Sequence, residues 1–368
     1  MVRIALVLIA RNEAGCIQRC LASARPWVDD LLVLDTGSTD ATIALARSAG
    51  ARVESFRWID DFAAARNRAL ELADADWNLV LDADEYLTLG GAEVAALRGT
   101  APGFVGAIRV DSELDAAGSG THASSWISRV LPRGVHYAGL IHEQPVHRLA
   151  VRRLAVHASH EGYRPQALLS KQGRNRALLE RALQVAPSDG YLLYQLGKDH
   201  SVYARHEEAA ACYERAAAST DALDPCAHDL LVRWLFALKK CGRHEQAVAL
   251  AESHMSTWQG SPDYWFTVAD LLLDWSCEQP AQATALLPMI EASWQRCLEI
   301  GERPDLEGAV HGRGSFLAAR NLALLSESLG RTEEARHWLE RSAMHAVPGG
   351  AEASATATAT AAATATTN

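Results

Sequence analysis

From Met1 to about Leu89, short apolar runs alternate with longer stretches of helical periodicity. The apolar runs lie at 3–9, 31–35, 52–55 and 78–82, and the helical patterns lie near 14–24, 39–48 and 61–73. Strands that are apolar on both faces and are joined by helices are typical of a parallel sheet with helices on both sides. The pattern therefore predicts a Rossmann-like α/β domain. Within it, Ser38 or Thr39 can cap the second helix, and Gly50 can end it in the left-handed conformation.

The third predicted helix has one apolar stripe at the i, i+3, i+4 spacing of a helix that packs on a core. On this pattern, Arg66 and Asn67 project from the flank of the stripe. The stripe consists of Phe62, Ala65, Ala69 and Leu72.

Residues 103–160 change character and resemble a series of short strands separated by Gly, Pro and Asp turns. We expect them to extend the sheet with antiparallel strands. The strand-like runs are FVGAIRV, SSWISRVL, VHYAGLIHE and VRRLAVHASH.

From Gln166 onward the pattern is helical, and it repeats. Leu196-Gly197 precedes Ala209 with the small and apolar offset of a helical hairpin. The pattern also has a period of 34 residues: Tyr213, Ala216 and Asp221 each follow their counterparts Leu179, Ala182 and Pro187 by 34 positions. This period resembles that of degenerate tetratricopeptide repeats over roughly 170–345, with one irregular unit near 262–300. A generic helical bundle is the alternative.

These patterns divide the chain into three parts. Residues 1–165 form the α/β domain and residues 166–346 form the helical-repeat domain. Residues 347–368 form a tail made almost only of Ala and Thr. Such a tail buries too little surface to offset the entropy of ordering, so we expect it to be disordered.

Composition limits the classes of function. The chain has 368 residues, of which 49% are hydrophobic and 22% charged, and its formal net charge is −10. This is typical of a globular protein of about two domains, and the negative charge argues against a nucleic-acid partner or an anionic membrane surface.

The seven cysteines are scattered, with no CxxC pair and no zinc-like spacing. They are typical of reduced thiols, so we expect a cytoplasmic protein. The run IALVLIA at 4–10 is followed by RNEAG, which favours a buried strand over a signal peptide. No apolar stretch approaches the roughly 18 residues needed for a transmembrane helix.

The run LVLDADE at 79–85 ends in closely spaced acids, Asp82, Asp84 and Glu85. A strand that delivers alternate carboxylates to its tip suits Mg²⁺ or Mn²⁺ together with a diphosphate. A solvated acidic loop is the alternative. The preceding strands and helices favour the first interpretation, because ligands of open α/β sheets bind beyond the carboxyl ends of strands.

Four segments in order, LIARNEAG, VLDTGSTDAT, WIDDFAAARNRAL and LVLDADE, resemble the family 2 glycosyltransferases with the GT-A fold. YAGLIHEQP and HASHEGY, followed by helical repeats, are similar to a bacterial subgroup of that family with a tetratricopeptide-like C-terminal part. The resemblance covers roughly 1–345. Thr36 stands where many members have a second Asp.

The resemblance implies roles for several residues in donor binding. Arg66 helps to position the nucleotide, Asp82 meets the ribose or the metal, and Asp84 binds the metal that bridges the phosphates. The residues expected around the nucleotide base are Ala10, Arg11, Glu13 and Asp35. Three alternatives stay open: Asp35 begins a turn with Gly37, Arg66 is a solvated arginine, and Glu13 interacts with a helix dipole.

Transfer also needs a base for the acceptor proton. Glu143 is the candidate, with His142 orienting it or touching the substrate, and a surface ion pair is the alternative. His160 resembles the late histidine that completes the metal or diphosphate shell in some members of the family, although a structural role is equally open. Three aromatic residues, Trp126, Tyr137 and Tyr163, are candidates to stack on sugar rings, but core packing is the more common role.

The sequence thus indicates a metal-dependent, inverting glycosyltransferase that uses Mn²⁺ or Mg²⁺ and a nucleotide-diphosphate sugar, most simply a UDP-sugar. The acceptor is a glycan, a lipid-linked glycan or a peptide, and a protein partner or a homo-oligomer through the repeats stays open. One rival is an interaction scaffold with an inert transferase domain. Another is a nucleotidyltransferase, but that function needs a basic glycine-rich loop that residues 1–20 lack.

Overall fold

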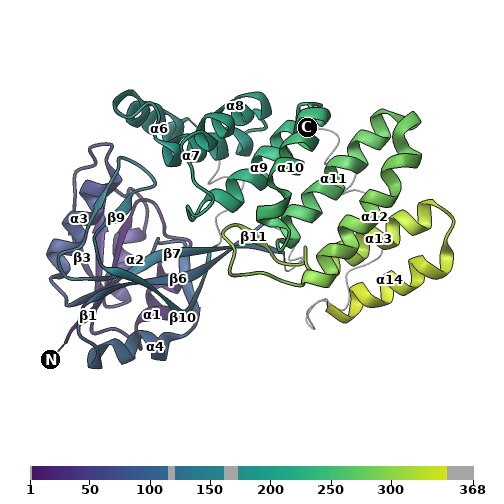
Figure 1. Ribbon diagram of the computed structural model, residues 1–368. Helices are drawn as coiled ribbons and strands as arrows, with labels where there is room; N and C mark the ends of the chain where they lie inside the picture. Colours follow the sequence, from purple (N-terminus) through teal and green to yellow (C-terminus); the bar gives the residue numbers. More distant parts are fainter. Residues whose placement is uncertain (1, 115–120, 161–172, 346–368) are drawn as a thin grey trace.

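The computed structural model describes residues 2–114, 121–160 and 173–345 (Figure 1). Its first part is an α/β domain and its second an array of helices, so the predicted fold class is confirmed. The first elements along the chain are β1 (Ile4–Ala10), α1 (Ile17–Ala24), β2 (Asp30–Asp35), α2 (Thr42–Ser48), β3 (Arg52–Ser55), α3 (Phe62–Ala73), β4 (Trp77–Val80), β5 (Glu85–Leu89) and α4 (Gly91–Ala96). A short 3₁₀ turn, Leu97–Gly99, follows.

Five further strands complete the α/β domain. They are β6 (Phe104–Glu113), β7 (His122–Pro132), β8 (His136–Ala138), β9 (Gln144–Val146) and β10 (Ala150–His160). The strand order of the main sheet is β3-β2-β1-β4-β7-β6-β10-β5, and β8 and β9 form a separate hairpin. The strands β1 to β4 are parallel, as the sequence predicts.

The prediction of a wholly antiparallel extension is wrong for one pair of strands. β7 runs antiparallel to β4 and β6, but β10 runs parallel to β6. β10 is antiparallel to β5, a strand that the sequence analysis did not predict. These pairings join segments far apart in the chain, and a periodicity within one strand does not specify its neighbours.

The predicted start of the second helix is also wrong. Ser38 and Thr39 do not cap it, because α2 begins at Thr42 and its cap residue, Ala41, makes no side-chain capping bond. Ser38 and Thr39 instead bond to the loop after β1. Gly50 has φ +82°, the left-handed conformation that the sequence predicts.

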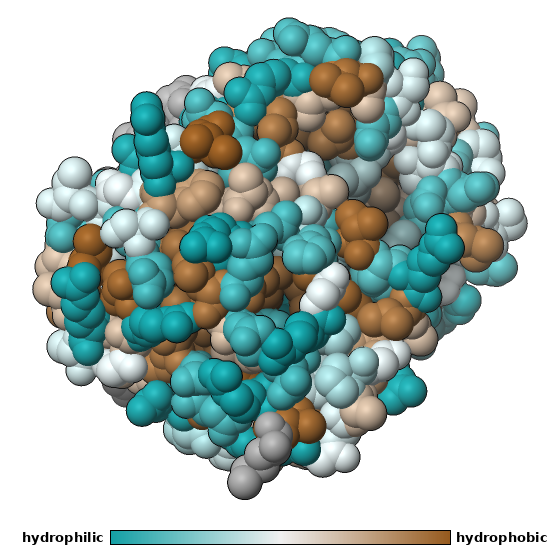
Figure 2. Space-filling view, turned by 90° about the vertical axis from the view of Figure 1, so that its left-hand side faces the viewer, coloured by the Kyte–Doolittle hydropathy of each residue, from teal (hydrophilic) through white to brown (hydrophobic). Residues whose placement is uncertain are grey.

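Alternate residues of β1 enter two cores. Leu6 packs with α1, α2 and α4 on one face of the sheet, and Val7 packs with α3 on the other. The side of the molecule at the left of Figure 1 shows hydrophilic side chains with smaller hydrophobic patches between them (Figure 2). The sheet is therefore covered on both faces, and its strand ends provide the edge on which a site can form.

The helical part consists of consecutive hairpins, as the sequence predicts. Gly197 sits against the ring of Tyr213, where an added Cβ would lie 2.4 Å from a ring carbon. α9 contacts both α7 and α11. The helices are α6 (Arg174–Val185), α7 (Gly190–Val202), α8 (His206–Ala217), α9 (Ala227–Lys240), α10 (His244–Trp258), α11 (Pro262–Glu278), α12 (Ala283–Ile300), α13 (Phe316–Ser328) and α14 (Thr332–His345).

The expectation of only helices after Gln166 is wrong at one place. A short strand, β11 (Ala309–Val310), pairs with β7 and so extends the N-terminal sheet from within the helical part (Figure 1). The surrounding loop, 301–315, bonds to both parts of the chain. Trp126 Nε1 donates to Pro304 O (2.9 Å), and Val310 N donates to Asp263 Oδ1 on α11 (2.9 Å).

The expected domain boundary at 165/166 and the expected disordered tail fall at 161–172 and 346–368, outside the described residues. In the described ranges, no helix is long and apolar enough to cross a membrane.

Candidate active site

The carboxyl ends of three parallel strands meet at one edge of the sheet. Ala10 ends β1, Asp35 ends β2, and Asp82 follows β4, which pairs with β1. The residues that the sequence analysis assigned to the donor therefore share one edge, as the topology of a parallel sheet requires.

The loops after β1 and β2 are tied together at this edge. Asn12 has φ +58°, and its Oδ1 accepts a bond from Thr39 N (2.8 Å). The bonds hold the turn that contains Arg11 and Glu13 beside Asp35. Three further bonds run from the N–H groups of Thr36, Asn12 and Glu13 to Ala10 O (2.9 Å), Ser38 Oγ (2.9 Å) and Thr42 Oγ1 (2.7 Å).

Asp35 is only 3% exposed, and its carboxylate accepts bonds from the N–H groups of Gly37 and Ser38, both at 3.0 Å. Gly37 has φ +110°, which favours glycine. Asp35 therefore shapes the turn, as the structural interpretation of the sequence expects. Glu13 is half-buried and accepts a bond from Cys16 Sγ, while Arg11 is exposed.

The helical part reaches this edge. Arg174 at the start of α6 lies over the ring of Phe62, 5.6 Å from its centroid, and Arg181 donates to Asp60 O (2.6 Å). Burial, and then the charge of Arg11, lower the pKa of Arg174. A residue of the helical part thus lies near the turn assigned to the nucleotide, which the sequence pattern did not indicate.

Asp82 is held by two arginines. Its Oδ1 lies 2.5 Å from Arg66 Nη2, and its Oδ2 lies 2.6 Å from Arg129 Nη2. Burial opposes its charge, but Arg129 and Arg66 outweigh burial and hold the pKa of Asp82 well below its usual range. Its side chain is nevertheless 38% exposed, so the ionised carboxylate faces solvent as well as the arginines.

Arg66 lies on the buried face of α3, and the expectation that it projects from the flank of the stripe is wrong. Its Nε donates to Glu143 Oε1, and its guanidinium carbon lies 5.6 Å from the centroid of the Tyr137 ring. The carboxylates of Asp82 and Glu143, on two other segments, compensate its charge. The apolar stripe of one helix carries no information about such partners. Arg66 Nη1 is buried and has no hydrogen-bond partner among the residues that the structure describes.

Arg129 belongs to this network and was missed by the sequence analysis, which named Glu85 as an acid behind Asp84 but gave it no role. Arg129 is 6% exposed and bridges Asp82 and Glu85 Oε1, 2.6 Å from each. Glu85 Oε2 also accepts a bond from Asp82 N (2.9 Å). Burial, and then the charge of Asp82, raise the pKa of Glu85 against the effect of Arg129. A lone arginine inside the apolar run WISRVLP was the available signal, because a buried charge needs a partner.

Asp84 points to a different partner. Its Oδ2 lies 3.3 Å from His160 Nε2, and Ser112 Oγ lies 3.2 Å from the other ring nitrogen of His160. Burial disfavours the charged ring, but the hydrogen bond and charge of Asp84 outweigh it and raise the pKa of His160. The sequence-predicted pair is therefore brought together by the pairing of β10 with β5, in which His160 lies opposite Glu85.

Glu143 lies beside this network on the loop between β8 and β9. Its side chain pairs with Arg66, as the alternative of a surface ion pair expects. It is only 8% exposed, however, so the pair is not on the surface. His142, with φ +50°, is exposed, yet burial and then the charge of Lys198 lower its pKa to about 4. His142 is neutral near pH 7 and lies between the acid network and the helical part.

The aromatic candidates have different positions. Tyr137 is buried in the core with α3, and burial raises its pKa to about 12. Trp126 bonds to the 301–315 loop, and Arg153 lies over its ring. Tyr163 lies outside the described residues. The two described aromatics therefore pack within the protein, as the more common role predicts.

The residues fit a divalent metal only in part. Over the described ranges, no group of three or more His, Cys, Asp or Glu side chains is arranged to hold a metal. Asp84 and His160 supply one carboxylate and one imidazole, whereas both oxygens of Asp82 are engaged by arginines. Mg²⁺ is commonly bound by one or two carboxylates together with substrate phosphates, which suits Asp84 better than Asp82.

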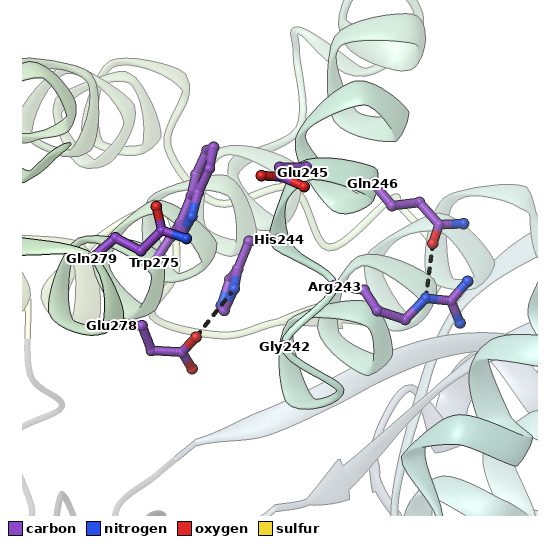
Figure 3. A pocket seen from close by; sticks show the side chains of 8 residues that line it. All are labelled: Gly242, Arg243, His244, Glu245, Gln246, Trp275, Glu278 and Gln279. Atoms are coloured by element: carbon purple, nitrogen blue, oxygen red, sulfur yellow. Dashed lines mark hydrogen bonds and ion pairs between the residues drawn. The ribbon is translucent and has the colours of Figure 1, made fainter.

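Two hollows lie in the helical part, away from this edge. One, of about 280 Å³, lies between the start of α10 and the end of α11, where His244 Nδ1 is 3.5 Å from Glu278 (Figure 3). The other, of about 370 Å³, is lined by residues such as Trp338. Neither contains a residue that the sequence analysis assigned to the chemistry, and a site at a strand edge needs no enclosed cavity.

Comparison with known proteins agrees with this geometry. Residues 5–106 match the sequence model of the family described as glycosyl transferase family 2. A TPR repeat-containing protein of Synechococcus elongatus is 54% identical over 89 residues, which are 24% of this chain and 22% of that protein. The SPbeta prophage-derived glycosyltransferase SunS of Bacillus subtilis is 26% identical over 211 residues, or 55% of this chain and 50% of that protein. The chain thus spans half or less of the length of these relatives.

Among solved structures, glucosyl-3-phosphoglycerate synthase from Mycobacterium tuberculosis, in complex with Mn²⁺, uridine diphosphate and glucosyl-3-phosphoglycerate, is 31% identical. The match covers 30% of this chain and 44% of that chain, with a TM-score of 0.25. At that score the likeness carries no argument about ligands.

Proposed function

We infer from the family 2 glycosyl transferase domain at residues 5–106 that this chain is a glycosyltransferase. We propose that it transfers a sugar from a nucleotide-diphosphate donor to an acceptor hydroxyl or other nucleophile. The observation that carries the proposal is the acid and arginine network at the tips of β1, β2 and β4. Open α/β sheets bind their ligands at such an edge.

The donor binds across the edge. The turn from Ala10 to Glu13 and the Asp35 loop receive the base and ribose, since their mutual bonds give a rigid surface. Asp82 faces the ribose while its charge holds Arg66 and Arg129 in place. The Nη1 of Arg66 has no hydrogen-bond partner within the described ranges, and we assign it to the sugar donor as a hydrogen-bond donor. We take uridine diphosphate as the nucleotide portion.

Asp84 and His160 are the residues that would hold Mn²⁺ or Mg²⁺. When bound, the cation neutralises charge that develops on the leaving diphosphate. The residues do the positioning: Asp84 supplies a hard oxygen, and Ser112 fixes the ring of His160. In this assignment Asp82 is not a metal ligand, and its carboxylate holds Arg66 and Arg129 in place.

Glu143 is the proposed base. It takes the proton from the acceptor nucleophile as that atom bonds to the anomeric carbon, while the bond from that carbon to the diphosphate oxygen breaks. The electron pair leaves with the nucleotide diphosphate, and the configuration inverts in a single displacement. Arg66 orients the carboxylate through one oxygen, Oε1. The acceptor class is a glycan, a lipid-linked glycan or a peptide.

A donor screen tests the proposal. The full-length protein is incubated with a panel of UDP-, GDP- and CMP-activated sugars, and release of the nucleotide is measured with and without Mn²⁺. We expect slow hydrolysis of one UDP-sugar that needs Mn²⁺ or Mg²⁺, and a higher melting temperature with that donor because a ligand that binds the native state stabilises it. Release from no donor, with no thermal stabilisation by any, would overturn the proposal.

A further inference from the structure

Lys198 on α7 is a half-buried cation that the proposed chemistry does not use. It is one of four lysines in the chain, with Lys171, Lys239 and Lys240. Its ammonium lies 5.0 Å from the centroid of the Tyr194 ring, and within the part of the chain that the structure describes it makes no hydrogen bond or ion pair. Lys239, in contrast, is paired with Asp274 at 3.2 Å.

The acids nearest to Lys198 are engaged by other groups. Asp229 on α9 lies 2.6 Å from Arg233 Nε and accepts a bond from the Tyr194 hydroxyl. Glu307, in the 301–315 loop, accepts a bond from Trp126 N (3.1 Å). Burial, and then the charge of Arg233, lower the pKa of Lys198, against the effects of Asp229 and Glu307. Among the described residues, this half-buried ammonium therefore has no direct counterion.

Helix α7 packs directly across the segment that carries the proposed base. Leu196 and Ile141 belong to one apolar cluster, and Gln144 Nε2 donates to Tyr191 Oη (2.7 Å). His142 and Glu143 lie between these two contacts. Tyr191 and Lys198 are seven residues apart on α7 and so lie on the same side of the helix, and the charge of Lys198 also contributes to the lowered pKa of His142.

The charged side chains along this junction are reached by solvent. Asp82 is 38% exposed, Arg233 is 33% exposed, His142 is exposed and Lys198 is half-buried. An anion in solution can therefore reach the stretch between the donor edge and α7.

Most of the inner face of the helical part is closed to an acceptor. His228 on α9 bonds to Glu307 O (2.7 Å), and Arg313 pairs with Asp263 on α11 (3.1 Å), so the 301–315 loop covers these helices. Gly308 lies so close to Asp229 that an added Cβ would be 2.3 Å from Oδ1. The part of α7 beside Glu143 therefore offers the approach to the base.

We propose that Lys198 forms an acceptor subsite for an anionic group, a phosphate or a carboxylate, and that this contact sets the acceptor nucleophile against Glu143. The proposal rests on the glycosyltransferase function. A half-buried ammonium without a counterion is costly, and an anion that binds beside it removes the cost in the bound state. The acceptor is then selected by its charge, because a neutral analogue leaves Lys198 uncompensated.

The scarcity of lysine makes a direct test practical. The lysines of the full-length protein are dimethylated with ¹³C-formaldehyde, which keeps their charge, and the few methyl signals are followed by NMR. Inorganic phosphate and acetate are titrated separately against chloride at constant ionic strength. Signals are assigned by Lys198→Arg, with Lys240→Arg as the matched control.

We expect the Lys198 signal to move saturably with one of the two anions and its pKa to rise, while the signals of Lys239 and Lys240 stay. A shift with phosphate would identify the acceptor group as a phosphate, and a shift with acetate would identify it as a carboxylate. A Lys198 signal that ignores both anions, or that moves no more than that of Lys240, would overturn the proposal.

Melting temperatures give a second measurement if methylation does not reach Lys198. The effective anion should stabilise the unmodified wild type and Lys240→Gln, but not Lys198→Gln. Equal stabilisation of Lys198→Gln would contradict the subsite. Donor hydrolysis by the wild type is measured in parallel: its absence would refute the glycosyltransferase function, whereas hydrolysis without a response at Lys198 would refute only the subsite.

Discussion

The edge of the N-terminal sheet and the inner face of α7, α9 and α11 both contain buried charges, but they compensate them differently. At the sheet edge, Arg66 Nη1 and Arg129 Nε have no hydrogen-bond partner among the described residues, and Asp82 is 38% exposed. On the helices, both ring nitrogens of His228 are paired, with Glu307 O and Ser261 Oγ, each at 2.7 Å. Two buried atoms there that lack a described partner, Gln195 Oε1 on α7 and Asp263 Oδ2 on α11, are acceptors rather than donors.

This difference separates a ligand site from a structural joint. Unused donors beside an ionised carboxylate are suited to a polar ligand that supplies the missing acceptors. Paired groups on α9 and α11 instead fasten the 301–315 loop, which carries β11 into the sheet. Lys198 on α7 resembles the sheet edge in one respect, because it too is a cation without a bonded partner among the described residues. The following experiments test whether the two networks differ in function.

The largest effect should follow from Arg129→Met. This variant leaves Asp82 and Glu85 beside each other without their shared cation, and removal of one partner of a buried ion pair costs about 3–5 kcal/mol. The measurement is the free energy of unfolding in urea. Arg133→Met is the matched control, because Arg133 and its partner Asp74 are exposed and such a pair contributes at most about 1 kcal/mol. Equal effects of the two variants would contradict the network.

Asp84→Asn should reduce donor turnover by about 10²–10³-fold, as expected when charge stabilisation in the transition state is lost. Stability should change little, because the partner of Asp84, His160, can lose its proton. Activity and melting temperature are measured together, with Asp74→Asn as a control on an exposed acid. Wild-type turnover of Asp84→Asn at saturating Mn²⁺ would refute the metal assignment.

Glu143→Gln should lower transfer by about 10²-fold, the usual contribution of a positioned base, while donor binding is kept. The amide oxygen can still accept the bond from Arg66, so the geometry is retained. The Michaelis constant for the donor and the rate at saturation separate the two effects. A collapse of donor binding with a normal rate at saturation would place Glu143 in the donor site.

Asp229 should make the helical network sensitive to acid. Burial opposes its charge, but Arg233 and then Lys198 outweigh burial and lower its pKa from 3.8 to about 2. Its contribution to stability is therefore present above pH 3.8 and is lost as the pH falls through about 2. We expect the stability difference between wild type and Asp229→Asn to shrink by about 2 kcal/mol over this window. A difference that is constant with pH would show that Asp229 is not ionised in the native state.

Trp126→Phe should have the smallest effect, about 1 kcal/mol, the net value of one hydrogen bond. It removes the bond from Nε1 to Pro304 O that joins the sheet to the 301–315 loop. Thermal unfolding followed by circular dichroism measures it, with Trp338→Phe on α14 as a control far from the joint. An unchanged stability of Trp126→Phe would show that this bond does not contribute to holding the loop.

Several parts of the fold and site were predictable because their signals are local. The runs that became β1, β2 and β4, the helices between them and the hairpins after Gly173 follow from periodicity within each segment. Asp82 and Asp84 were recognisable because a strand tip followed by alternate acids is a local pattern, and Asp35 because a parallel sheet brings strand ends together.

What the sequence by itself determined was thus the type of most elements, the edge of the sheet at which the acids gather, and the family that these motifs resemble. Only the tertiary structure decided which charges meet. The burial of Arg66, the bridge by Arg129, the insertion of β11 into the sheet and the approach of Lys198 to His142 all join segments distant in the chain. Such partners are chosen by the packing of whole elements, because an isolated segment carries the charge but not the position of the group that compensates it.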